Sequence, residues 1–222
     1  MCTRFSFDLT KEKIRKQFNI TLKNDLDKSF NVSPAQAAYV YKADAADLSY
    51  HRWGLIPYWA KNPTNGDHLT HAMAEGIETK DSFRMSVRYK RCVVFADSYY
   101  DKVRKNNAEQ HYRILLSNGN PIAMGAIWDL WTDDRGYQYY SFALISTEAN
   151  EELKGSGFAR MPVIFTEEEQ VKHWLNPELE LQGVLKILRQ KDELPLQIYA
   201  ISNAIEHEKN NYPELHREIN LY

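Results

Sequence analysis

Cys2 is the residue whose type and position offer the most distinctive chemistry in this chain. It follows Met1, so removal of that methionine would leave a backbone amine and a thiol on adjacent carbons. Such a 1,2-aminothiol condenses with an aldehyde to an imine, and its sulfur can then close on the same carbon to give a stable thiazolidine ring. Both groups are partly reactive near neutral pH, because a free α-amine has a pKa of about 7.7–8.0 and a free thiol about 8.5. Taken alone, a residue so near the terminus is more simply a disordered tail.

A stretch of aromatic and basic residues is the second feature with chemical potential. It lies at the end of a predicted strand and reads His51-Arg52-Trp53-Gly54-Leu55-Ile56-Pro57-Tyr58-Trp59-Ala60-Lys61. A tryptophan in such a place can stack on a nucleobase, a contact worth about 1–3 kcal/mol per base, while Arg and Lys neutralise phosphates. The alternative is that Trp53 and Trp59 belong to the core, with their N–H groups bonded to backbone. For one of the two, the sequence favours that alternative.

The composition bounds the kind of protein that these residues serve. The chain has 222 residues, 43% of them hydrophobic and 26% charged, and no linker or repeat divides it, so we expect one domain over 1–222. The net charge of −2 gives no global basic field, and nucleic-acid binding would need a local cluster of Arg and Lys. Cys2 and Cys92 make neither a disulfide framework nor a zinc site and suit a reducing cytoplasm, where we expect the protein. No signal peptide, membrane span or cofactor is predicted.

The pattern of apolar residues predicts many strands and few helices. Expected strands are Ala37–Lys42, Leu48–Ile56, Cys92–Tyr99, Tyr112–Leu116, Pro121–Trp128, Gln138–Ser146, Pro162–Phe165 and Leu196–Ile201. Expected helices are Thr10–Phe18, Ser82–Tyr89, Thr166–Leu175 and Leu179–Arg189, the third with Thr166 as N-cap and Glu169 completing a capping box. Ser117-Asn118-Gly119-Asn120-Pro121 is a hairpin turn. These elements predict an α+β fold, a mixed and mostly antiparallel barrel-like sheet with short flanking helices in a single domain.

Several segments together resemble the SOS response-associated peptidase (SRAP) family, the abasic-site processing proteins that shield abasic sites in single-stranded DNA. They run in family order along almost the whole chain: Met1-Cys2-Thr3-Arg4, Phe30-Asn31-Val32-Ser33-Pro34-Ala35-Gln36, Arg52-Trp53-Gly54-Leu55-Ile56-Pro57, Ser82-Phe83-Arg84, Arg91-Cys92-Val93-Val94, Ser146-Thr147-Glu148-Ala149-Asn150 and Arg160-Met161-Pro162-Val163-Ile164. One such segment would be weak evidence, whereas the ordered set is specific.

The resemblance implies a function that fits the chemistry of Cys2. An abasic deoxyribose opens to an aldehyde, which the Cys2 amine and thiol would trap as a thiazolidine DNA–protein crosslink once Met1 has been removed. The implied partner is single-stranded DNA with abasic sites, with no metal and no cofactor. Arg4, Arg84 and Arg160 would bind phosphates, and Trp53 with Pro34 would lie against a base or sugar. Family members also use a Glu, an Asn and a His, of which the acid and the His move protons.

The chain departs from the family at those three positions. Where the family has Asn-Ala-Arg-Ala-Glu, this sequence reads His71-Ala72-Met73-Ala74-Glu75, and the expected Glu is Asp101, set back by about 1.5 Å. The family His two positions before Arg-Met-Pro is Phe158, which cannot transfer a proton. His71 is a candidate substitute because an imidazole titrates near neutral pH. It is at least as well explained as a hydrogen-bonding residue that replaces the Asn in geometry alone, and His68 with His71 lacks a third metal ligand.

Three functions therefore remain open. The first is crosslinking of abasic sites through Cys2, assisted by Asp101 and His71. The second is a divergent family member that binds DNA but has lost part of the reaction, such as crosslink reversal or removal of Met1. The third is an N-terminal-nucleophile cysteine amidohydrolase, which is disfavoured because those enzymes continue with Gly after the Cys, whereas this chain continues with Thr3-Arg4.

Overall fold

The computed structural model describes residues 2–43, 45–105, 108–190 and 193–220. Its strands are β1 (Arg4–Phe7), β2 (Ser29–Val32), β3 (Ala37–Lys42), β4 (Ser49–Trp53), β5 (His71–Met73), β6 (Arg91–Ala96), β7 (Ser98–Lys105), β8 (Ala108–Leu116), β9 (Ile122–Thr132), β10 (Gln138–Glu148), β11 (Arg160–Pro162), β12 (Ile164–Phe165) and β13 (Leu196–Ile201). Its α-helices are α1 (Lys11–Phe18), α2 (Arg84–Tyr89), α3 (Glu151–Gly155), α4 (Glu168–Leu175) and α5 (Leu181–Arg189). Short 3-10 helices are η1 (Pro63–His68), η2 (Asn203–Glu206) and η3 (Pro213–His216).

The strands form two sheets in the described part of the chain. The smaller has the order β13-β8-β7-β1-β2, and the larger has the order β11-β10-β4-β3-β6-β9-β12 with β5 beside β10. Pairing of β9 with β10 closes the ring β10-β4-β3-β6-β9, which makes this part of the larger sheet a barrel. The pairs β10–β4 and β10–β5 are parallel and the other strand pairs are antiparallel.

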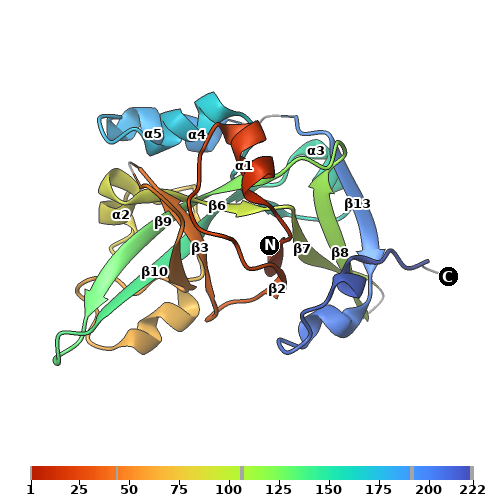
Figure 1. The fold of residues 1–222 in the computed structure, drawn as a ribbon, viewed down its shortest axis with the longest axis horizontal. Coiled ribbons are helices and arrows are strands. Elements are labelled where there is room, and N and C mark those ends of the chain that lie inside the picture. The colour runs from red at the N-terminus through yellow and green to blue at the C-terminus, as the bar shows by residue number, and fades with distance from the viewer. Residues whose placement is uncertain (1, 44, 106–107, 191–192, 221–222) are drawn as a thin grey trace.

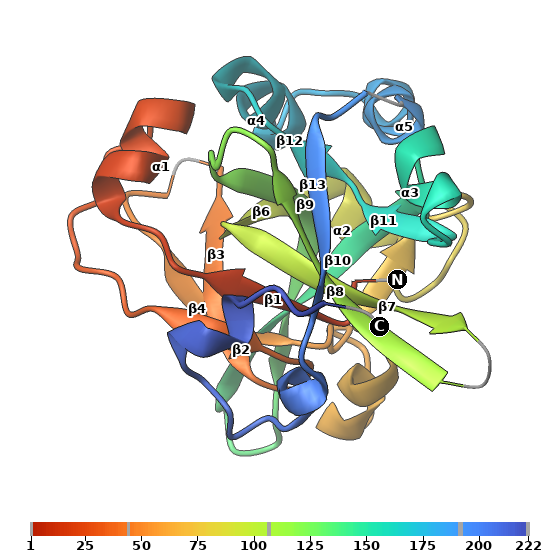
Figure 2. The same cartoon turned by 90° about the vertical axis from the view of Figure 1, so that its right-hand side faces the viewer.

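Strand β6 shows why the molecule has two cores. All six of its residues are buried, and they alternate between the two sides of the larger sheet. Val93 and Phe95 join the core beneath the helices, whereas Cys92, Val94 and Ala96 join the core between the sheets. Figure 1 shows α1, α4 and α5 gathered over one side of the strands, and Figure 2 shows the strands of the smaller sheet crossing in front of those of the larger one. Cys2 belongs to the core between the sheets.

The expected fold class is confirmed: the fold is α+β, with mixed, mostly antiparallel, barrel-like strands and short helices. The extent of the single domain, 1–222, stays a prediction. Among the described residues, no helix is long and apolar enough to cross a membrane.

Several predicted boundaries were wrong for physical reasons. The strand expected over Cys92–Tyr99 is two strands, β6 and β7, because the chain passes from one sheet to the other at Asp97. The Asp97 carboxylate accepts the Asp8 N–H and pairs with Arg113 at 2.8 Å, which fixes this crossing. The strand expected over Leu48–Ile56 ends at Trp53, because Gly54 has a φ of 128° and a side chain there would meet the Gly66 carbonyl.

The N-terminus of α4 also differs from the prediction. The N-cap is Glu167, one residue beyond the predicted Thr166, and the helix begins at Glu168. The side chain that reaches back is Gln170 and not Glu169: its Oε1 accepts the N–H groups of Thr166 at 2.9 Å and Glu167 at 3.1 Å. The capping-box mechanism therefore holds with its register moved by one residue.

Candidate active site

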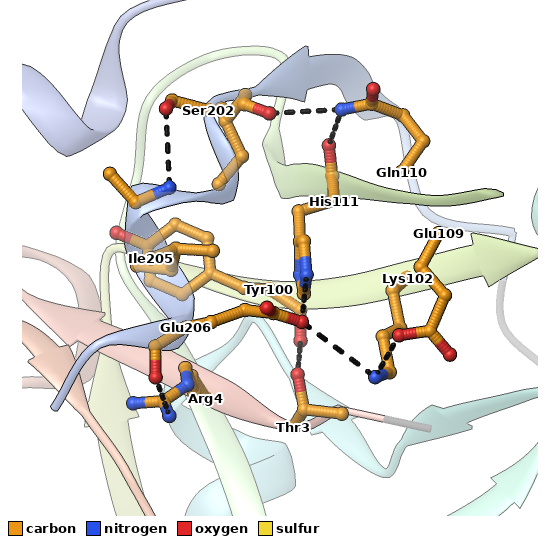
Figure 3. Close-up of polar contacts among 12 residues, drawn as sticks. Thr3, Arg4, Tyr100, Lys102, Glu109, Gln110, His111, Ser202, Ile205 and Glu206 are labelled. Atoms are coloured by element: carbon orange, nitrogen blue, oxygen red, sulfur yellow. Dashed lines mark hydrogen bonds and ion pairs between the residues drawn. The ribbon is translucent and has the colours of Figure 1, made fainter.

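Cys2 is positioned by the start of β1, the strand that joins β2 to β7. The register pairs Arg4 with Tyr100, and the Thr3 N–H donates to the Tyr100 carbonyl at 2.9 Å. Figure 3 shows Thr3 directed at this carbonyl. The Cys2 thiol is buried and its Sγ lies 3.4 Å from the Arg4 carbonyl. Cys2 is therefore held in the fold, next to the stretch of β7 that carries Asp101.

Asp101 is a buried carboxylate on β7. Its Oδ1 accepts the Lys102 N–H at 2.8 Å, and only 1% of the residue is exposed. Burial raises the pKa of Asp101 above its usual range. The pKa of the Cys2 thiol is also raised, first by burial and then by the Asp101 charge, so the thiol is protonated in the folded chain at neutral pH.

His71, on β5, lies near the Cys2 backbone. Pairing of β5 with β10 sets its position, with Leu144 as its register partner. Its Nδ1 lies 3.0 Å from the Thr70 hydroxyl. Burial lowers the pKa of His71 to about 4, and the nearby Cys2 backbone opposes that shift. The imidazole is therefore neutral at pH 7, and can accept a proton or orient Cys2 but is not an imidazolium donor.

Trp53 forms a wall of this site, and its contact with a base or sugar stays a prediction. Its side chain is fully buried, its indole N–H donates to the Thr70 carbonyl at 2.9 Å, and the His71 ring lies edge-on at 5.6 Å. Pro34 is half-buried in the turn between β2 and β3, and the next residue, Ala35, donates its N–H to the Trp53 carbonyl. Of the two tryptophans of this stretch, Trp59 is the exposed one, at 49%.

The three predicted phosphate-binding arginines have different surroundings. Arg4 donates to Asn31 Oδ1 at 3.1 Å and to the Glu206 carbonyl at 2.8 Å. Arg160 pairs with Glu75 at 2.7 Å, and its charge contributes to the lowered pKa of His71, which places it near Cys2. Arg84, the first residue of α2, is exposed and lies beside Asp81. Figure 1 shows α2 well away from the amino terminus. The structure thus brings Arg4 and Arg160 to the neighbourhood of Cys2, but not Arg84.

Phe158 stands where the resemblance implies a histidine. It is buried and packs edge-on against Tyr112 with ring centroids 5.6 Å apart, and Tyr112 is the register partner of Asp101. The position is therefore close to the site but offers only an apolar ring.

A second histidine, which the sequence analysis did not single out, lies near Asp101. His111 of β8 is the register partner of Lys102, and its Nε2 lies 2.9 Å from Glu206 Oε1. Figure 3 shows the imidazole directed at this carboxylate, with Lys102 on the opposite side of it. His111 and Glu206 are 95 residues apart in the chain, so no local spacing could have indicated the pair. In the described ranges, no three His, Cys, Asp or Glu side chains gather in a group that could hold a metal ion.

Comparisons with known proteins place the whole chain in a family. The family model described as SOS response associated peptidase (SRAP) matches residues 1–208. The chain is 35% identical to the abasic site processing protein YoqW of Bacillus subtilis (strain 168), covering 97% of this chain and 98% of that protein. It is 26% identical to the abasic site processing protein HMCES of Rattus norvegicus, covering 84% of this chain and 64% of that protein. A crystal structure of a Bacteroides thetaiotaomicron protein shares the fold, with a TM-score of 0.88 at 24% identity over 99% of this chain and all of the other.

Proposed function

Because the chain belongs to the SRAP family, we propose that it processes abasic sites in single-stranded DNA, with Cys2 as the nucleophile after removal of Met1. The observation that carries the proposal is the meeting of Cys2, Asp101 and His71 at the start of β1. These residues come from three separate stretches of the chain, and only the fold brings them together. Met1 itself lies outside the described residues.

The reaction proceeds in two steps at the aldehyde carbon of the opened deoxyribose. The Cys2 amine adds to the carbonyl, and the carbinolamine loses water to give an imine. The sulfur then adds to the imine carbon, and the thiol proton passes to the imine nitrogen, which closes the thiazolidine. No oxidant or cofactor is required, because every atom except the released water stays in the product.

Asp101 and His71 have different parts in this scheme. Burial raises the pKa of the Asp101 carboxyl group and so favours its protonated form, and Asp101 is the group that carries the proton between sulfur, nitrogen and leaving water. The neutral His71, held by Thr70, lies against the Cys2 backbone and limits its position. Arg160, whose charge acts on His71, could meet a phosphate, provided that the strand displaces Glu75 from it.

Intact-mass measurement of the protein, alone and after mixing with an abasic single-stranded oligonucleotide, tests the proposal. The expected protein mass lacks Met1, and the adduct mass equals protein plus oligonucleotide minus one water. Cys2→Ala should abolish the denaturant-stable adduct, and Cys2→Ser should give at most a labile imine because an alcohol closes the ring poorly. A stable adduct in Cys2→Ala would assign the nucleophile to a lysine and overturn the proposal.

The second function left open, a member that binds DNA but has lost part of the reaction, is favoured by one observation. Phe158 packs against Tyr112, which is the register partner of Asp101, and its side chain cannot donate a proton. Reversal of the crosslink needs protonation of the ring, so formation without efficient reversal is the form that this loss would take. Incubation of the purified adduct with excess hydroxylamine, which traps the released aldehyde, measures the rate of crosslink reversal. We expect the protein to be released from the DNA more slowly than the crosslink forms.

A further inference from the structure

Four side chains extend the core between the sheets to the solvent, on the closed ring of the larger sheet. They are Lys42 of β3, His51 of β4, Trp128 of β9 and Tyr140 of β10, and each lies two residues along its strand from a member of that core: Val40, Trp53, Ala126 and Phe142. Because side chains alternate along a strand, the four lie on the face of the ring that carries this core. Tyr140 is 38% exposed, and Lys42 and Trp128 are partly exposed, so a ligand can reach the cluster.

The four side chains contact one another, although they come from four strands. Lys42 Nζ lies 4.5 Å from the centre of the Trp128 ring and 5.2 Å from the centre of the Tyr140 ring. The His51 ring lies edge-on to Tyr140, with centroids 5.2 Å apart, and its centroid is 6.1 Å from that of Trp128. A cation, an imidazole and two aromatic rings therefore meet at one place.

The cluster carries a positive charge that no carboxylate neutralises. Lys90 Nζ also lies over the Trp128 ring, at 5.5 Å, but it pairs with the buried carboxylate of Asp129. In the part of the chain that the structure describes, the ammonium group of Lys42 has neither a carboxylate partner nor a hydrogen bond. The charge of Lys42 is thus available to an anion.

Several polar atoms of the cluster also lack a hydrogen-bond partner among the described residues. His51 is only 1% exposed and its Nδ1 is unpaired, and so is the buried hydroxyl of Ser49, two residues earlier on the same face of β4. The indole N–H of Trp128 has no acceptor in the described ranges either. By contrast, backbone carbonyls accept the indole N–H groups of the buried tryptophans Trp53, Trp131 and Trp174. Since buried polar groups are normally paired, so many open groups at one place indicate a ligand.

We propose that this cluster is a nucleotide-binding site, in which Lys42 binds the phosphate and the base lies against the Tyr140 ring. The ammonium group of Lys42 attracts an anion, and the open N–H and O–H groups beside it can donate to phosphate oxygens. Stacking on an aromatic ring tolerates every base, so the site requires no particular base. The phosphate ester belongs either to a free nucleotide or to one nucleotide of a strand, which share this chemistry. The inference goes beyond the proposed function, because none of these groups takes part in the chemistry at Cys2.

NMR of the protein with isotope-labelled histidine and tryptophan side chains tests the inference. Deoxyadenosine monophosphate should shift the signals of the His51 ring and the Trp128 indole in a saturable way, and deoxyadenosine at the same concentration should not. Lys42→Gln should weaken this binding by about tenfold or more, because it removes a charge-assisted contact. Lys16→Gln, at an exposed lysine of α1, is the matched control and should bind as the wild type does. Tyr140→Leu should weaken binding of the nucleotide but not of inorganic phosphate. Thermal unfolding of each variant confirms that it is folded.

A short thymidine oligonucleotide without abasic sites distinguishes the two sources of the phosphate. Shifts with the mononucleotide that the oligonucleotide does not reproduce assign the site to a free nucleotide. Shifts with the oligonucleotide alone, lost in Lys42→Gln, assign it to a strand. The inference is overturned if neither probe moves the His51 and Trp128 signals, or if Lys42→Gln binds both probes as tightly as the wild type. Because no crosslink is measured, failure of the proposed function would leave this result unaffected.

Discussion

Asp101 and Phe158 are the two residues at which restoring the family pattern should change the rate. Asp101→Glu extends the carboxylate toward Cys2, and Phe158→His supplies a proton donor next to Tyr112. General acid–base groups contribute about 10²–10⁴ in rate, so the double variant should speed crosslink formation or reversal measurably. Single-turnover reactions on denaturing gels at several pH values measure both directions. A restored variant that matches wild type in both would show that proton transfer at these positions is not rate-limiting.

His71 should act through its hydrogen bonds and not through titration. Because burial lowers its pKa to about 4, it is neutral throughout the range in which crosslinking is measured. His71→Asn, the residue that the family resemblance implies, should therefore preserve the rate and the pH profile, whereas His71→Ala should slow the reaction by loosening Cys2. Single-turnover crosslinking between pH 6 and 8 distinguishes them. Equal rates in the alanine and asparagine variants would remove His71 from the mechanism.

The same lowered pKa makes stability depend on pH. His71 takes up a proton near pH 6.5 when unfolded but only near pH 4 when folded, so the unfolded state binds more protons between these values and stability falls as the pH is lowered through them. The loss is at most about 3 kcal/mol, and His51, whose pKa burial also lowers to about 4, adds to it. Urea unfolding at pH 7 and pH 4.5 should show a smaller difference for His71→Asn than for wild type. His68→Asn, at an exposed histidine, should leave the difference unchanged.

Strand β1 is the element that turns a chain terminus into a reaction centre. The Thr3 N–H is its outermost hydrogen bond to β7, and Thr3→Pro removes that donor and restricts Cys2 as well. A misplacement of about 1 Å can cost about 10² in rate, so crosslinking should slow strongly while the unfolding temperature changes little. Thr3→Ala keeps the N–H and is the matched control. Intact mass must show that Met1 is removed from both variants, and similar rates in the two would contradict the importance of this hydrogen bond.

The elements differ in how well the sequence predicts them, for physical reasons. Strands β3 and β13 were predicted with their observed bounds, and strand β10 and helix α5 to within two residues, because each has a run of β-branched, aromatic or helically spaced apolar residues. Strands β1 and β2 have four residues each and were missed, because so short an alternation is no stronger than that of a loop. These missed strands carry Cys2 and Arg4 to the site. Likewise, the sequence around Trp53 does not indicate whether its ring is exposed or lies against His71, as it does in the structure.

At the scale of the whole molecule, the site lies where the two sheets meet. Cys2 and Trp53 belong to the same core between the sheets, Asp101 comes from the smaller sheet, and His71 comes from the larger one. One half of the site belongs to the larger sheet, with Trp53 on the ring strand β4 and His71 on β5, which pairs with the ring strand β10. The other half depends on how β1 and β7 pack against it, so crosslinking should be more sensitive than overall stability to changes between the sheets.

The net charge of −2 makes salt dependence the sharpest test of how the whole molecule binds DNA. Attraction must come from a local basic surface, and for single strands the logarithm of affinity should fall with the logarithm of salt by about 0.7 for each phosphate neutralised. Arg160→Ala should weaken binding and reduce this slope by about 0.7, because Arg160 lies near Cys2. Arg160→Ala also leaves Glu75, which pairs with Arg160 at 2.7 Å, as an uncompensated negative charge. The double variant Arg160→Ala with Glu75→Gln is therefore compared with Glu75→Gln alone. Arg189→Ala, at an exposed arginine of α5 on the helical side of the molecule, is the matched control. A slope near zero in the wild type, or equal slopes in the Arg160 and Arg189 variants, would show that the strand does not pass over Arg160.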